Sequence, residues 1–65
     1  MDWMTYMDEN LTEVQDEMRG WLMDCGIGDE ELAEMDDAEV FYAVQNLYDG
    51  GVPQMVYDAF LTGEV

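Results

Sequence analysis

Residues 4–25, MTYMDENLTEVQDEMRGWLMDC, decide the fold of this chain. When each residue is stepped by about 100° around a helix axis, the apolar side chains gather in one arc of about 100°, and acidic side chains gather nearly opposite. The apolar arc holds Met4, Met7, Leu11, Val14, Met18, Trp21, Leu22 and Cys25. This pattern is typical of an amphipathic helix, which we expect over residues 3–25 with Cys25 buried on its apolar side.

Both ends of this helix have local signals. Asn10 and Glu13 have capping-box spacing, so a regular helix could begin there, although Asp2 could cap a longer one. Gly26 can adopt the left-handed conformation that ends a helix, and Ile27 would then fold back onto the last turn.

The rest of the chain also has helical spacing. Residues 28–36 predict a short helical turn whose inner side chains are Leu32 and Met35. Asp36 and Glu39 have the spacing of a helix cap, which starts a further helix that Asp49-Gly50-Gly51 ends. The expected inner face of that helix is Val40, Phe41, Val44, Leu47 and Tyr48.

A last helix is expected over residues 53–62, because Pro53 suits a first helical turn. Its predicted inner face is Val56, Tyr57, Phe60 and Leu61. No strand alternation and no linker interrupts this pattern. The sequence therefore predicts an all-α fold, a small single-domain bundle of three main helices plus one short helix that spans residues 1–65. A chain of this length would be roughly 28 Å across.

The charge balance excludes several functions. The chain has 17 Asp and Glu, one Arg, no Lys and no His, which gives a net charge of −16. Direct binding to nucleic acid or to an anionic membrane needs Lys and Arg to displace counterions, so neither is expected. Arg19 follows Asp16 by about one helical turn, and we expect these two residues to form an ion pair.

Catalytic residue types are scarce. His, Lys and Ser are missing, and Cys25 is the lone thiol, so serine triads, cysteine–histidine pairs and His- or Cys-based zinc sites have no partners. No stretch has the alternating oxygen ligands of a calcium-binding EF-hand loop. We therefore expect no enzyme activity, no catalytic residues, no metal site and no cofactor.

The chain should nevertheless fold, because 49% of its residues are hydrophobic, and acidic disordered chains lack that content. A lone Cys and the absence of a basic, apolar start favour the cytoplasm, or the host cytoplasm if the protein is viral. We expect a monomer because like charges on two copies repel, but a dimer stays open since the core is small.

Twelve acidic residues form the predicted partner-binding surface. Their number exceeds solubility needs, which a net charge of about 2–8 satisfies in a small domain. The set is Glu9, Glu13, Asp16, Glu17, Asp24, Asp29, Glu30, Glu31, Glu34, Asp36, Asp37 and Glu39. The simplest interpretation of these acidic residues is a solvent-exposed face that keeps the protein soluble.

The amount of charge suggests a likeness to DNA. Duplex DNA carries about one negative charge per 1.7 Å, so sixteen charges match roughly 27 Å of duplex. On one continuous helix, Glu9 lies about 6 Å from Glu13 and about 10.5 Å from Asp16 along the axis, which is comparable with phosphate spacing. These values predict a basic nucleic-acid-binding protein or complex as the partner, with this protein in its groove.

Short length, near-total loss of Lys, helical periodicity and a dense acidic coat resemble the small phage-encoded DNA mimics of the antirestriction and anti-CRISPR type. The resemblance is one of composition over the whole chain. It implies a stoichiometric, non-catalytic inhibitor of a host defence complex.

Two alternatives stay open. Proteins of extreme halophiles are also acidic and poor in Lys, and they lose their fold at low salt. An acidic adaptor could instead bind a basic patch on a transcription or replication protein without imitating DNA.

Overall fold

The structure is a computed structural model that describes residues 2–62. All regular elements in this range are helical: α1 (Trp3–Glu9), α2 (Leu11–Asp24), α3 (Asp29–Glu34), α4 (Asp37–Leu47), α5 (Gly51–Val56) and η1, a π-helical segment (Tyr57–Leu61) that continues α5. The prediction of an all-α fold is confirmed.

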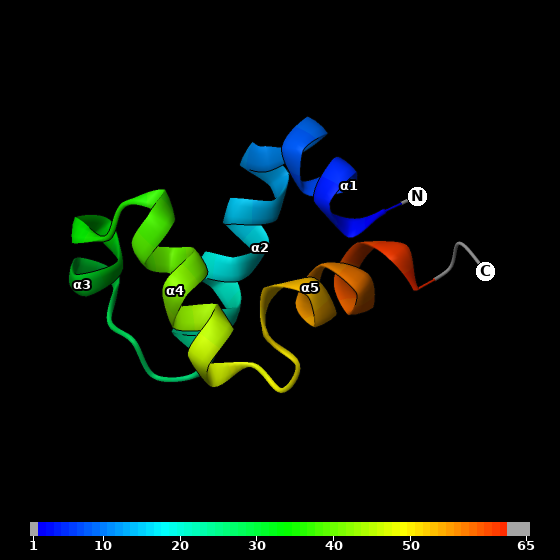
Figure 1. The fold of residues 1–65 in the computed structure, drawn as a ribbon. Coiled ribbons are helices and arrows are strands. Elements are labelled where there is room, and N and C mark those ends of the chain that lie inside the picture. Colours follow the sequence, from blue (N-terminus) through cyan, green and yellow to red (C-terminus); the bar gives the residue numbers. More distant parts are fainter. Residues whose placement is uncertain (1, 63–65) are drawn as a thin grey trace.

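The helices are arranged around α2, which runs through the middle of the molecule (Figure 1). Helix α4 packs against α2, and α5 packs against both α4 and α1. Helix α3 lies at one end, whereas α1 and η1 lie at the other. The body measures 36 × 21 × 16 Å, so it is longer and thinner than the expected sphere.

The core lies where α2, α4 and α5 meet. Val14, Met18 and Leu22 of α2 are almost fully buried, as the helical spacing predicts. The other buried apolar side chains are Leu32, Val40, Val44, Val52, Met55, Val56 and Leu61. The central part of the predicted apolar arc is therefore the main contribution of α2 to the core.

The predicted single helix over residues 3–25 is wrong, because it breaks at Asn10. This residue has φ −127° and ψ 40°, outside the helical region. Its backbone N–H and its Nδ2 both donate to the Tyr6 carbonyl oxygen, at 2.9 and 3.1 Å. A short polar side chain that satisfies the backbone in this way competes with helix continuation.

The break allows α1 to fold back onto α5 and η1. The rings of Tyr6 and Phe60 lie 5.2 Å apart, and Trp3 and Met7 pack against the core. A straight helix would have carried these residues beyond the core, so the bend buries apolar surface that continuation would leave in water.

Three members of the predicted apolar arc are exposed instead of buried. Met4 is on the outside of α1 and Leu11 lies at the bend, with exposed fractions of 57% and 42%. Cys25, the C-cap of α2, is also exposed, so the expectation of a buried thiol is wrong. Helical spacing predicts the burial of these residues wrongly because each lies outside α2 or at one of its ends.

Helix α2 ends as predicted. Gly26 has φ +105°, and its N–H donates to the Met23 carbonyl oxygen at 2.9 Å. Ile27 N–H donates to the Leu22 carbonyl oxygen at 3.2 Å, which completes a Schellman motif. This turn directs the chain back toward α2, where Leu32 of α3 is buried and Met35 is half-buried.

The predicted cap of α4 is confirmed, since Asp36 Oδ1 accepts a hydrogen bond of 2.8 Å from Glu39 N–H. The predicted inner position of Leu47 is wrong, because this side chain is 58% exposed. The chain leaves the helix there, and Tyr48 packs on Trp21 with ring centroids 5.2 Å apart. Leu47 thus lies at the helix end beyond the cover of α2.

The last helix starts earlier than predicted, at Gly51. Gly50 and Gly51 both have positive φ, 90° and 75°, which lets the chain reverse between α4 and α5. Tyr57, predicted to face inward, is 48% exposed. The buried side of α5 is formed by Val52, Met55 and Val56, and one further residue turns Tyr57 about 100° away from Val56. The i to i+5 spacing of the π-helical segment then brings Leu61 back into line with Val56.

Within the described range, none of the helices combines the length and apolar character required to cross a membrane.

Candidate acidic interaction surface

All twelve carboxylates of the predicted surface are exposed. Helix α2 supplies Glu13, Asp16, Glu17 and Asp24, which share one side of the helix opposite its buried residues. Helix α3 and the start of α4 supply most of the others. Burial of the opposite faces thus fixes the direction in which these carboxylates project.

Arg19 joins the acidic side of α2 to α3. Its Nη1 donates to the Leu32 carbonyl oxygen at 2.9 Å, and its Nη2 donates to the Met35 carbonyl oxygen at 3.1 Å. Leu32 lies in the last turn of α3 and Met35 is its C-cap. The Leu32 carbonyl oxygen also accepts a hydrogen bond of 3.1 Å from Met35 N–H, and carbonyl groups at a helix C-terminus attract a cation. Arg19 therefore holds α3 against α2.

The ion pair of Arg19 is formed with Asp37, at 3.4 Å between Nη2 and Oδ1, and the predicted pair with Asp16 is wrong. The planar guanidinium can reach two carbonyl groups and a carboxylate together, which explains its preference for this position. The sequence held one signal for this role, namely the position of Arg19 between the apolar arc and the acidic arc of α2.

Gln15 is a second link that the helical spacing missed. The side chain is 5% exposed, and its Nε2 donates to the Asp37 carbonyl oxygen at 3.3 Å. Within residues 2–62 its Oε1 has no hydrogen-bond partner. Together, Gln15 and Arg19 attach the start of α4 and the end of α3 to neighbouring turns of α2.

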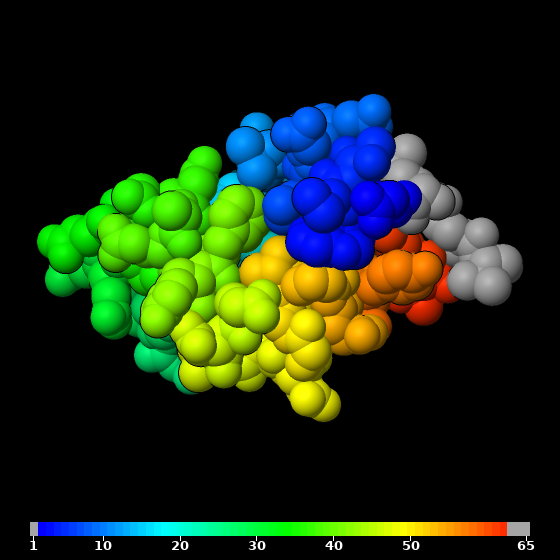
Figure 2. Space-filling model, viewed as in Figure 1, coloured from blue at the N-terminus to red at the C-terminus, as the bar shows by residue number. Residues whose placement is uncertain are grey.

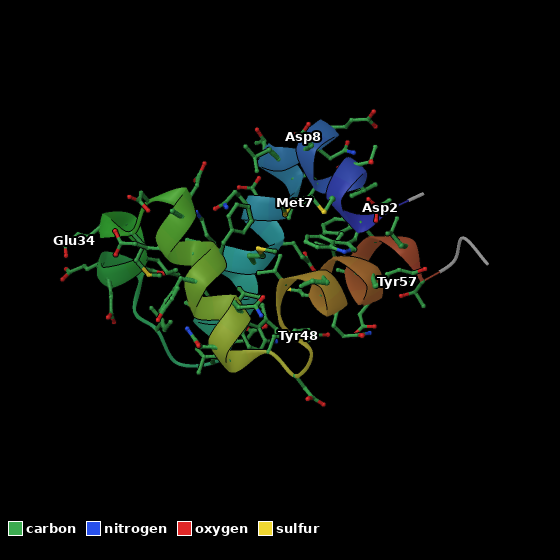
Figure 3. The ribbon with its side chains drawn as sticks, in the orientation of Figure 1. Asp2, Met7, Asp8, Glu34, Tyr48 and Tyr57 are labelled. Atoms are coloured by element: carbon green, nitrogen blue, oxygen red, sulfur yellow. The ribbon has the colours of Figure 1, made fainter. Side chains whose placement is uncertain are left out.

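The α3 carboxylates lie at the narrow end of the molecule. Figure 2 shows α3 and the start of α4 (green) projecting away from α1 (blue) and α5 (orange). Glu34 points outward at this end, whereas Asp8 lies on α1 on another side (Figure 3). Asp29, Glu30 and Glu31 form the first turn of this same short helix.

Glu9 is not placed as the sequence predicts. It is the last residue of α1, and the bend at Asn10 separates it from α2. Its axial distances to Glu13 and Asp16 therefore do not follow from the rise of one continuous helix. The four acidic residues that lie within α2, which are Glu13, Asp16, Glu17 and Asp24, keep regular helical spacing.

Most of these carboxylates have no partner inside the protein. Asp36 caps α4 and Asp37 pairs with Arg19. The side chains of the other ten make no hydrogen bond or ion pair with any residue between 2 and 62. Unpaired carboxylates at the surface keep their full attraction for an external cation.

A separate polar cluster lies at the junction of α4 and η1. Tyr48 Oη donates to Asp58 Oδ2 at 2.7 Å, and Gln54 Nε2 donates to Asp58 Oδ1 at 2.8 Å. The hydrogen bond from Tyr48, followed by that from Gln54, lowers the pKa of Asp58. The same bond to Asp58 raises the pKa of Tyr48. These residues lie outside the predicted surface and attach η1 to the end of α4.

The described residues include no group of three or more His, Cys, Asp or Glu side chains arranged to hold a metal ion. The arrangement suits electrostatic attraction, since many carboxylates on a helical body can contact several cations of a partner together. Comparison with protein-family models, with curated proteins and with solved structures finds no match to this chain.

Proposed function

We propose that this protein is a non-catalytic inhibitor that presents a DNA-like acidic surface to the nucleic-acid-binding groove of a basic partner, a host defence complex of the CRISPR or restriction type. The observation that carries the proposal is the excess of exposed, unpaired carboxylates on a small helical body with one cation, which is itself bound to α3.

The charge density supports this proposal. A net charge of −16 along a 36 Å axis corresponds to about one charge per 2 Å, against about one per 1.7 Å in duplex DNA. A groove lined with Lys and Arg would attract both at comparable strength. Association would be fast and would weaken with salt.

The test compares two variants of equal charge. In one, the acidic residues of the first turn of α3 are reversed by Asp29→Lys, Glu30→Lys and Glu31→Lys. In the control, the reversed residues lie outside the predicted surface, by Asp2→Lys, Asp8→Lys and Asp49→Lys. Each variant, immobilised beside the wild type, is exposed to bacterial lysate at low and at about 0.5 M salt, which screens surface charge.

The proposal is supported if the immobilised wild type and the control variant both capture a nucleic-acid-processing complex, and if duplex DNA and salt each release this complex. The α3 variant should bind this complex at least tenfold more weakly, and the purified wild type should block its DNA binding at about one copy per complex. Equal weakening by both variants, or a partner that DNA does not displace, would contradict the proposal.

The adaptor alternative has a specific signature, namely a captured partner that binds this protein and duplex DNA at the same time. The halophile alternative predicts that far-ultraviolet circular dichroism reports unfolding in 10 mM salt and folding in 2 M salt. A DNA mimic should stay helical in 10 mM salt.

A further inference from the structure

A shallow hollow lies beside the outer side of α4 within the predicted acidic surface. It has a volume of about 400 Å³ and is lined by Met35, Asp36, Ala38, Glu39, Tyr42 and Ala43. Tyr42 is 73% exposed, the largest exposed fraction among the big apolar side chains of residues 2–62. Because its α4 neighbours Ala38 and Ala43 are small, the Tyr42 ring is open to a partner.

The edge of this hollow is acidic. Asp36 is fixed by its hydrogen bond with Glu39 N–H, and the Glu39 carboxylate has no partner in the described part of the chain. The sole cation, Arg19, is occupied by the carbonyl groups of Leu32 and Met35 and by Asp37. The hollow thus combines an open aromatic ring with two carboxylates, and no residue between 2 and 62 forms an ion pair with either of them.

We infer that this hollow binds an arginine side chain of the basic partner. The guanidinium would stack on the Tyr42 ring and donate to the carboxylates of Asp36 and Glu39, while its apolar stem covers Ala38 and Ala43. Arginine fits better than lysine, since its planar group can stack on a ring and form paired hydrogen bonds together. This inference rests on the proposed function, because that function supplies the basic partner.

Two other features fit this role less well. A hollow beside Trp21 also has acidic neighbours, Glu17 and Asp24, but one face of the indole is covered by Tyr48. A second copy of this chain is a poor occupant, since it would bring further carboxylates toward Asp36 and Glu39.

The inference can be tested with two peptides of equal charge, nona-arginine and nona-lysine. Their Kd values for the wild type are measured by calorimetric titration at 0.15 M salt, together with the NMR shifts of Ala38 and Ala43. Tyr42→Phe keeps the ring and Tyr42→Leu removes it. Tyr57→Leu is the matched control, because Tyr57 is also exposed and lies on η1.

The wild type and the Tyr42→Phe variant should bind nona-arginine about threefold or more tightly than nona-lysine, as expected for a cation on an exposed ring. Tyr42→Leu should lower this preference by about twofold or more, because only the paired hydrogen bonds to the carboxylates would still favour arginine. Tyr57→Leu should preserve the full preference. Equal binding of the two peptides by the wild type, no binding of either, or a preference that Tyr42→Leu leaves unchanged overturns the inference.

The two proposals fail in different ways. A wild type that blocks DNA binding by its partner yet shows no Tyr42-dependent preference refutes only the arginine site. A Tyr42-dependent preference without DNA displacement supports the arginine site and refutes the proposed function.

Discussion

Replacing Arg19 should loosen α3 from the rest of the molecule. The variant Arg19→Met keeps an unbranched apolar stem but removes the two hydrogen bonds to the Leu32 and Met35 carbonyl oxygens and the ion pair with Asp37. Each hydrogen bond is worth about 1 kcal/mol net, and an ion pair with an exposed partner adds a few tenths. The expected loss in the free energy of unfolding is about 2 kcal/mol.

Urea denaturation followed by circular dichroism measures this loss, and hydrogen exchange locates it. For a domain of this size, about 2 kcal/mol corresponds to a decrease in Tm of about 8–16 °C. In the Arg19→Met variant, the amides of α3 should exchange faster than those of α2. Without Arg19, few contacts hold α3 in place, and among them is the buried side chain of Leu32. Urea is preferred to guanidinium because it does not screen charge.

Two controls separate hydrogen bonding from net charge. Arg19→Lys keeps the charge but lacks the planar group that reaches both carbonyl groups, so it should recover less than half of the lost stability. Repeating the series in 1 M salt, where the Debye length is about 3 Å, removes long-range repulsion. The reasoning is refuted if Arg19→Met stays within about 0.5 kcal/mol of the wild type, or if Arg19→Lys is fully stable.

Three further outcomes are expected. The Tm of the wild type should rise between 0.02 and 0.5 M salt, since screening weakens carboxylate repulsion; a flat Tm would contradict this. Tyr48→Phe should raise the pKa of Asp58 in an NMR titration, because it removes the hydrogen bond that lowers it most. Because folding lowers the pKa of Asp58, its contribution to the free energy of unfolding is present above the unfolded pKa of about 4 and is lost as pH falls through the folded pKa. A pKa of Asp58 that is the same in Tyr48→Phe and in the wild type would argue against the hydrogen bond. Gly20→Ala should stabilise the protein by about 0.5–1 kcal/mol, because there is open space around the added Cβ. Gly51→Ala should destabilise it, because the φ of Gly51 is +75° and the added Cβ would lie 2.6 Å from Gln45 Oε1. In thermal melts, the Tm values of the two variants should therefore shift in opposite directions.

Local signals in the sequence determined several features of this protein. The turn at Gly26 and the cap at Asp36 were predictable because each depends on residues within one or two helical turns. The burial of Val14, Met18 and Leu22 followed from helical spacing for a similar reason. The exposure of the twelve carboxylates follows from the cost of burying a charge.

Tertiary structure decided the features that depend on residues far apart in the chain. Asn10 could end or continue a helix, and the apolar contact of Tyr6 with Phe60 accompanies the bend. The alignment of buried Leu61 with Val56 depends on a π-helical register that apolar spacing does not encode. Arg19 pairs with Asp37 and not with Asp16, since only the folded chain brings the end of α3 within reach of its guanidinium.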